Sequence, residues 1–124
     1  DRQLLRKALD YYQGYFLEGE TSPWAISFRN QLRAHYTRII EQYAKILEQN
    51  SDWKGAIECY LRAIEIEPLV EIFYTNLMNT YIQLDRDNDA VLVYHRCRQS
   101  LQARLGINPS PHIQAIYHTI IHTQ

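Results

Sequence analysis

The sequence predicts an all-α protein in which antiparallel helix pairs stack side by side. Apolar residues recur at steps of three or four along most of the chain, which is the period of an amphipathic helix. No alternating strand pattern and no hairpin dipeptide interrupts them. Three residues that share one helix face also recur 34 positions later with matched size and character. The recurring pairs are Ala56 and Ala90, Tyr60 and Tyr94, and Ala63 and Cys97.

The interval of 34 residues is that of the tetratricopeptide repeat, a helix pair whose second helix packs small and aromatic residues against its partner. The predicted architecture is a tetratricopeptide-like antiparallel helix-pair array with capping helices, forming a single domain over residues 1–124. Its two repeats cover about 37–70 and 71–104. Because two repeats alone are marginally stable, helices expected at about 3–13 and 111–122 would cap the open ends.

The first expected element is a short amphipathic helix over about 3–13, followed by a loop that contains two glycines. Ser22 before Pro23 is typical of a helix cap followed by proline at the first helical position. A long helix is expected from there to about residue 49, because its apolar residues fall mostly at steps of three or four. These residues are Trp24, Phe28, Leu32, Tyr36, Ile39, Ile40, Tyr43 and Leu47.

Four shorter helices follow, each bounded by residues that begin or end helices. Asp52 caps the first of them and Pro68 stops it. Gln102 stands one repeat after Pro68, so the corresponding helix of the second repeat can continue further, until Gly106 ends it. Ser110, followed by proline, repeats the cap-then-proline signal before the last helix. The expected ranges are about 53–67, 70–84, 88–105 and 111–122.

The composition is that of an ordinary globular protein, with 46% hydrophobic and 22% charged residues. A net charge of −1 gives no broad attraction for nucleic acid or for an acidic membrane surface. No stretch approaches the roughly 20 apolar residues that cross a bilayer. The two cysteines form no CxxC pair, which favours a reducing cytoplasm. The chain begins at Asp1 inside a helix pattern, as expected of a fragment from a longer protein.

Charge is placed unevenly along the chain. No Asp or Glu follows Asp89, whereas Arg96, Arg98 and Arg104 do. Two interpretations stay open, a solvated helix face and a small basic patch for a partner.

Polar residues on the first helix of each repeat are the candidates for contacting a protein partner, because repeat arrays bind along a concave surface. Their moderate length suits hydrogen bonding to an extended or helical segment, and the alternative is that they form only a solvated helix face. The match between the repeats is incomplete, since Arg38 aligns with Ile72. The candidates are Arg38, Glu41, Gln42 and Lys45 in the first repeat and Thr75, Asn76, Asn79 and Gln83 in the second.

The residues that carry chemistry form no reactive arrangement. His118 and His122 stand four apart on one helix, but a zinc site needs a third and a fourth ligand. Glu65 and Glu67 point to different helix faces and make no acid–base pair. No phosphate-binding loop and no nucleophile motif occurs. The sequence therefore predicts no catalytic, cofactor-binding or metal-binding residue, and no enzyme.

The segment Tyr94–Pro111, YHRCRQSLQARLGINPSP, closely resembles the characteristic tail of the bacterial transcriptional activator domain. Upstream, YYQGYFLEG, PWAISFRNQLRAHY and AIECYLRAIEIEPLVEIFYTNLMNTYIQLDRDNDAVLVY are similar to the same family. The similarity runs from about Leu9 to Ile121. One departure is visible, because Asn108 and His112 stand where the family often has acidic residues.

This resemblance implies a tetratricopeptide-like helical domain that lies beside a DNA-binding domain in bacterial regulators, including the antibiotic-regulatory activators. In that family the domain usually follows a winged helix-turn-helix module and contributes to activation and oligomerisation. The expected function is a protein-interaction and activation domain that docks RNA polymerase, a second copy in a homodimer, or neighbouring domains. DNA would be bound only by a separate domain absent from this chain, and no membrane partner is expected.

A general tetratricopeptide adaptor or peptide-binding scaffold is the alternative function. A receptor that clamps a carboxylate needs a basic groove across about three repeats. Here Arg38 and Lys45 are the cations of the expected groove, and Glu41 offsets them in part. The tail from Tyr94 to Pro111 favours the regulator over the adaptor.

Overall fold

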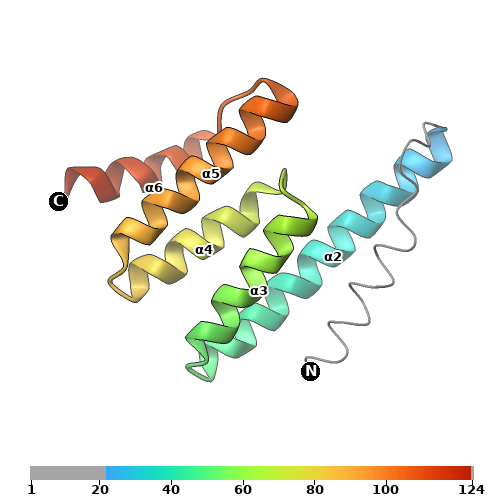
Figure 1. Cartoon of the computed structure of the whole chain (residues 1–124). Coiled ribbons are helices and arrows are strands. Elements are labelled where there is room, and N and C mark those ends of the chain that lie inside the picture. Colours follow the sequence, from blue (N-terminus) through green and yellow to red (C-terminus); the bar gives the residue numbers. More distant parts are fainter. Residues whose placement is uncertain (1–21, 124) are drawn as a thin grey trace. The chain divides into compact units, whose positions relative to one another are not determined.

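The computed structural model describes residues 22–123, and every regular element in that range is an α-helix. The all-α fold class is therefore confirmed. The helix expected at about 3–13 lies outside the described residues. Each of the four shorter helices begins and ends within one residue of the range expected for it. The helices are α2 (Pro23–Gln49), α3 (Trp53–Ile66), α4 (Glu71–Gln83), α5 (Asp87–Leu105) and α6 (Pro111–His122), as labelled in Figure 1.

The chain divides into two compact units, the first ending at Ile39 and the second beginning at Ile40, so α2 contributes to both. In the first unit Tyr36 is buried, whereas the Trp24 side chain is 64% exposed and Phe28 also lies at the surface. The apolar residues expected along this part of α2 are therefore only partly buried.

In the second unit α3, α4, α5 and α6 follow one another, and each packs on the next (Figure 1). The recurring residues form the seams between these helices, since Ala56, Ala63, Ala90 and Cys97 have no exposed surface. Small residues at these positions let helix axes approach closely. The residues that recur after 34 positions are thus buried packing residues. The remaining buried apolar residues of this unit are Ile40, Ala44, Cys59, Tyr60, Ile64, Phe73, Tyr74, Leu77, Met78, Tyr81, Val93, Tyr94, Leu101, Ile113 and Ile120.

The helix ends follow the expected residues, with one exception. Asp52 caps α3, because its Oδ1 accepts a hydrogen bond of 3.0 Å from the Gly55 N–H. A Cβ at Gly55 would lie 2.5 Å from Asp52 Oδ2, so a larger residue there would require the Asp52 side chain to shift. Gly106 ends α5 in the left-handed conformation, with φ of 65°. Ser110 precedes α6 as expected, but its side chain makes no capping bond.

Both cysteines are buried free thiols of the second unit. Burial raises the pKa of the Cys59 thiol from 9.0 to about 12. Burial and the negative charge of Glu71 together raise the pKa of the Cys97 thiol to about 12 as well. Because the folded pKa lies above the unfolded value, the stabilisation is fully present below about pH 9 and is lost as the pH rises toward 12.

We expect the midpoint of urea unfolding to fall between about pH 8 and about pH 11, because unfolding releases the thiols to ionise. Over this pH range the urea midpoint should fall less in the Cys59→Ala/Cys97→Ala variant, whatever the stability of that variant at neutral pH. Alkylation by iodoacetamide gives a second measurement, since native thiols at about pH 8 should react far more slowly than thiols unfolded in urea. Equal alkylation rates in the native and unfolded chain would contradict the burial.

Candidate interaction surface

A polar surface lies where the second-unit part of α2 meets α4, and two hydrogen bonds join the helices there. Asn76 Nδ2 donates to Glu41 Oε2 at 3.2 Å. Thr80 Oγ1 donates to Glu48 Oε1 at 2.5 Å. Asn76 and Thr80 are one turn apart on α4, and the two glutamates are two turns apart on α2, so each helix contributes one row of side chains. We call these residues, together with Lys45, the α2–α4 polar face.

Tyr60 of α3 borders the same carboxylates. Its side chain is only 3% exposed, and burial is the main cause that raises the pKa of its hydroxyl. The negative charges of Glu48 and Glu41 raise this pKa further. Within residues 22–123 the Tyr60 hydroxyl makes no hydrogen bond.

The structure brings some of the eight predicted residues together and separates others. Glu41 and Asn76 are half-buried and bonded to each other. Thr75 is buried, and its hydroxyl donates to the Glu71 carbonyl at 3.2 Å, so its printed bond lies within α4 and does not join α2. The repeat interval aligns Glu41 with Thr75, but the residue that bonds Glu41 is Asn76, the next residue of α4. Successive side chains of a helix point about 100° apart, so Thr75 and Asn76 face in different directions. Of the others, Gln42, Lys45, Asn79 and Gln83 are exposed, and Arg38 is exposed in the first unit.

Sequence reasoning missed two residues of the α2–α4 polar face, namely Glu48 and Thr80. Glu48 follows Glu41 by seven residues and Thr80 follows Asn76 by four, so helix periodicity places each on the same row as a predicted residue. Helix periodicity could therefore have indicated both Glu48 and Thr80 from the sequence. Tyr60 was assigned to the core, and its burial agrees with that assignment.

The charge of the α2–α4 polar face is net negative. Lys45 stands between Glu41 and Glu48 on one side of α2, four residues after the first and three before the second. Its side chain is exposed, and across residues 22–123 it forms no ion pair. The surface thus offers carboxylate and amide groups, and none of the face's residues is a cysteine or serine nucleophile. Its chemistry suits recognition by hydrogen bonds and charge.

The family described as "Bacterial transcriptional activator domain" matches residues 1–121 of the chain. The chain belongs to this family. Regulatory protein AfsR of Streptomyces coelicolor is 29% identical over 97% of the chain and 12% of its own length. Transcriptional regulatory protein EmbR of Mycobacterium tuberculosis is 34% identical over 56% of the chain and 18% of its own length. Transcriptional regulatory protein MoaR1 of the same species is 33% identical over 48% of the chain and 19% of its own length. The chain thus spans less than a fifth of each of these relatives.

In this bacterial transcriptional activator domain, the segment Tyr94–Pro111 covers the second half of α5 and the link from α5 to α6. Pro109 is buried, and its carbonyl accepts a hydrogen bond of 2.7 Å from Gln114 Nε2. The Ser110 N–H donates to Glu71 Oε1 at 2.9 Å, which fastens the link to the first turn of α4. Asn108 Oδ1 accepts from Gln102 Nε2 at 2.6 Å. The amide at position 108 therefore has a contact with the last turns of α5.

The histidine pair of α6 has no metal-binding surroundings among the described residues. The His118 and His122 rings stack with centroids 6.2 Å apart. No group of three or more histidine, cysteine, aspartate or glutamate side chains between residues 22 and 123 is placed to hold a metal ion.

Tyr117 of α6 stacks on Tyr94 of α5 with ring centroids 4.1 Å apart, which fixes α6 against its neighbour.

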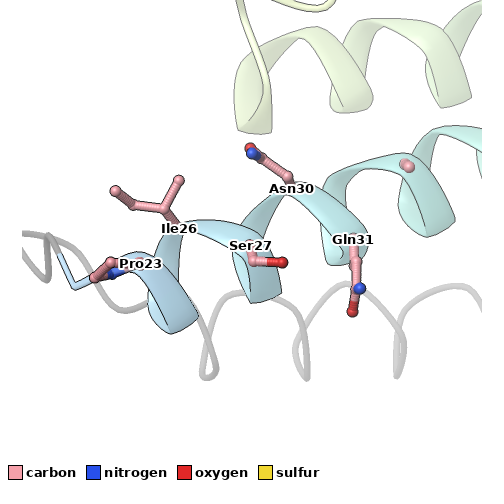
Figure 2. Close-up of a pocket in the computed structure, with 6 residues that line it drawn as sticks. Pro23, Ile26, Ser27, Asn30 and Gln31 are labelled. Atoms are coloured by element: carbon pink, nitrogen blue, oxygen red, sulfur yellow. The ribbon is translucent and has the colours of Figure 1, made fainter.

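A hollow in the first unit, at the start of α2, contains none of the predicted site residues. Figure 2 shows Ile26 and Asn30 projecting from one side of the helix and Gln31 from another. None of the described residues that line it is titratable. These residues are Pro23, Ile26, Ser27, Asn30, Gln31 and Ala34. Between residues 22 and 123, no helix combines the length and the apolar character needed to cross a membrane.

Proposed function

We propose that this bacterial transcriptional activator domain is a protein-interaction and activation domain of a longer regulator. The α2–α4 polar face supports this proposal most directly, because α4 and the second-unit part of α2 hold carboxylate and amide side chains in place by hydrogen bonds. Side chains held in this way lose less freedom when they bind a partner. Exposed Asn79 and Gln83 extend the row of Asn76 along α4 and add donors and acceptors.

The proposed partners are RNA polymerase, a second copy of the chain in a homodimer, and the regulator's neighbouring domains. DNA would be bound by a separate domain, since AfsR, EmbR and MoaR1 are each more than five times longer than the part that this chain matches. The domain would act in the cytoplasm, where bacterial promoters are. It would bind without a cofactor and catalyse no reaction.

A reporter experiment tests the activation function. The chain is fused to an unrelated sequence-specific DNA-binding domain, and expression is measured from a promoter that carries the matching operator. We expect the fusion to raise expression over the DNA-binding domain alone, and Asn76→Ala/Asn79→Ala to lower the gain, because it removes two amides from the α4 row. Gln99→Ala removes an exposed amide from α5 and is the matched control.

Immunoblotting should show equal amounts of the fusions. A fusion that leaves expression unchanged would overturn the activation function. Sedimentation velocity of the purified chain over a range of concentrations then measures self-association separately. If Asn76→Ala/Asn79→Ala activates as strongly as the parent fusion, the α4 row is not the surface that acts.

A further inference from the structure

Resting on the interaction function proposed above, we propose that the outer side of α6 binds an acidic amphipathic helix of a partner protein. The partner helix would lie against α6 as α5 lies against α4. In Figure 1, α6 follows α5 as the last helix of the second unit. We call its outer side the open α6 face, and the residues of this face are Gln114, Tyr117, His118 and Ile121.

The buried residues of α6 follow the same pattern as those of α4, counted from the first residue of each helix. The third residue has no exposed surface in either helix, namely Phe73 in α4 and Ile113 in α6. The tenth residue is also buried in both, namely Thr80 and Ile120. Furthermore, α6 packs on α5 as α4 packs on α3. The two helices therefore have equivalent places in the array, each as the first helix of a pair.

One side of α4 is covered by α5, the second helix of its pair. The Tyr74 hydroxyl donates to Ser100 Oγ of α5 at 3.3 Å. Further along α4, the guanidinium of Arg86, at the N-cap of α5, lies 4.8 Å from the centre of the Tyr81 ring. This side consists of the fourth, seventh, eighth and eleventh residues of α4, and all of them are buried, namely Tyr74, Leu77, Met78 and Tyr81.

The corresponding side of α6 is the open α6 face, and it is much less covered. Ile121 corresponds to Tyr81 and is 38% exposed. His118 corresponds to Met78, which has no exposed surface, yet His118 is exposed. Tyr117 is half-buried. A helix packed there would bury the remaining apolar surface of Tyr117 and Ile121, as the second helix of a pair does.

The charge around the open α6 face is positive, which favours an acidic partner. Residues 40–89 of the second unit carry ten acidic and four basic side chains, whereas residues 90–123 carry three arginines, four histidines and no acidic side chain. Arg98 lies one turn after Tyr94, whose ring stacks on Tyr117, so Arg98 projects from the α6 side of α5. It is exposed, and no acidic residue of the described chain pairs with it. Glutamates beside the apolar side of a partner helix would complement this charge.

A synthetic amphipathic helix provides the probe. Its sequence is acetyl-Glu-Leu-Glu-Ala-Leu-Leu-Glu-Glu-Leu-Ala-Glu-Leu-Leu-Glu-amide, in which the leucines fall on one side of the helix and the glutamates on the other. The charge control replaces every glutamate by lysine. The pattern control, acetyl-Glu-Leu-Glu-Ala-Leu-Glu-Glu-Leu-Ala-Leu-Leu-Glu-Glu-Leu-amide, has the composition of the probe but distributes its leucines around the helix. Sedimentation of each peptide alone sets a concentration range in which it is monomeric.

Calorimetric titration of the 124-residue chain at low salt should give the tightest binding with the probe, and added salt should weaken that binding. We expect Ile121→Ala to weaken it about tenfold through lost apolar contact. Arg98→Gln should weaken it about threefold, because the ion pair would lie at the surface. Two matched controls should leave the affinity unchanged. Leu92→Ala truncates an exposed apolar residue of α5 outside the open α6 face, and Arg62→Gln removes an exposed arginine of α3.

Amide hydrogen exchange of the parent chain gives a second measurement that needs no variant. The bound probe should slow exchange in α6 and leave α3 unchanged, because the added helix holds α6 in place. Binding of either control peptide as tightly as the probe would overturn the proposal. Unchanged affinity in Ile121→Ala, or exchange that slows elsewhere but not in α6, would also overturn it.

Sedimentation velocity without peptide tests for a different occupant of the open α6 face. If the parent chain is a dimer and Ile121→Ala is a monomer, a second copy occupies the face and the proposal is wrong. The reporter fusion above tests activation through residues of α4, whereas the titration measures helix binding to α6. A failure of the proposed function and a failure of this inference are therefore distinguished.

Discussion

Phe73→Ala is expected to lower the free energy of unfolding by about 3–5 kcal/mol. Phe73 has no exposed surface and lies in α4, the helix that packs against both α3 and α5. Truncation removes the ring from the centre of the second unit and leaves a cavity there, which adds to the lost burial energy. Urea unfolding followed by circular dichroism gives the change as a lower midpoint at an unchanged slope.

Leu92→Ala is the matched control for that experiment. Leu92 is an apolar residue of α5 that is 66% exposed, so its truncation should change stability by less than about 0.5 kcal/mol. Comparable losses in the two variants would contradict the placement of Phe73 in the core.

Ile113→Ala is expected to cost about 2–5 kcal/mol and to act first on α6. Ile113 is fully buried, and α5 is the helix against which α6 packs. Since α6 has few other buried residues, its release from α5 should need less energy than unfolding of the whole unit. Amide hydrogen exchange should therefore show protection lost in α6 before it is lost in α3 and α4.

Ile121→Ala removes the same kind of side chain from the same helix at a position that is 38% exposed. It should lower stability and the protection of α6 much less than Ile113→Ala does. If exchange in Ile113→Ala increases uniformly over the second unit, α6 does not open separately and the prediction is wrong.

The fold could be predicted from this sequence because the evidence for it is local or periodic. Pro68, Gly106 and Pro111 mark helix ends through backbone geometry alone, and the structure places them where helices end or begin. The small residues Ala56 and Ala90 indicate equivalent packing positions on two helices, and both are buried. The exposure of Trp24 was not predictable from spacing, because periodicity gives the face of a helix but not what covers it.

The surface was less predictable because it depends on how α2 and α4 are rotated and shifted against each other. Neighbouring residues of a helix point about 100° apart, so Thr75 is buried while Asn76, the next residue, bonds Glu41. Repeat alignment assigns residues to equivalent positions but does not fix this rotation. Glu48 bonds Thr80 although it aligns with Ile82. Pairings between helices therefore required the structure.

The chain contains two tryptophans, and the boundary after Ile39 leaves one in each compact unit. Trp24 is largely exposed near the start of α2, and Trp53 opens α3 half-buried. Each unit thus has its own intrinsic fluorophore. In Trp24→Phe the emission comes from Trp53 alone, so its wavelength reports the melting of α3 and its neighbours without any attached dye.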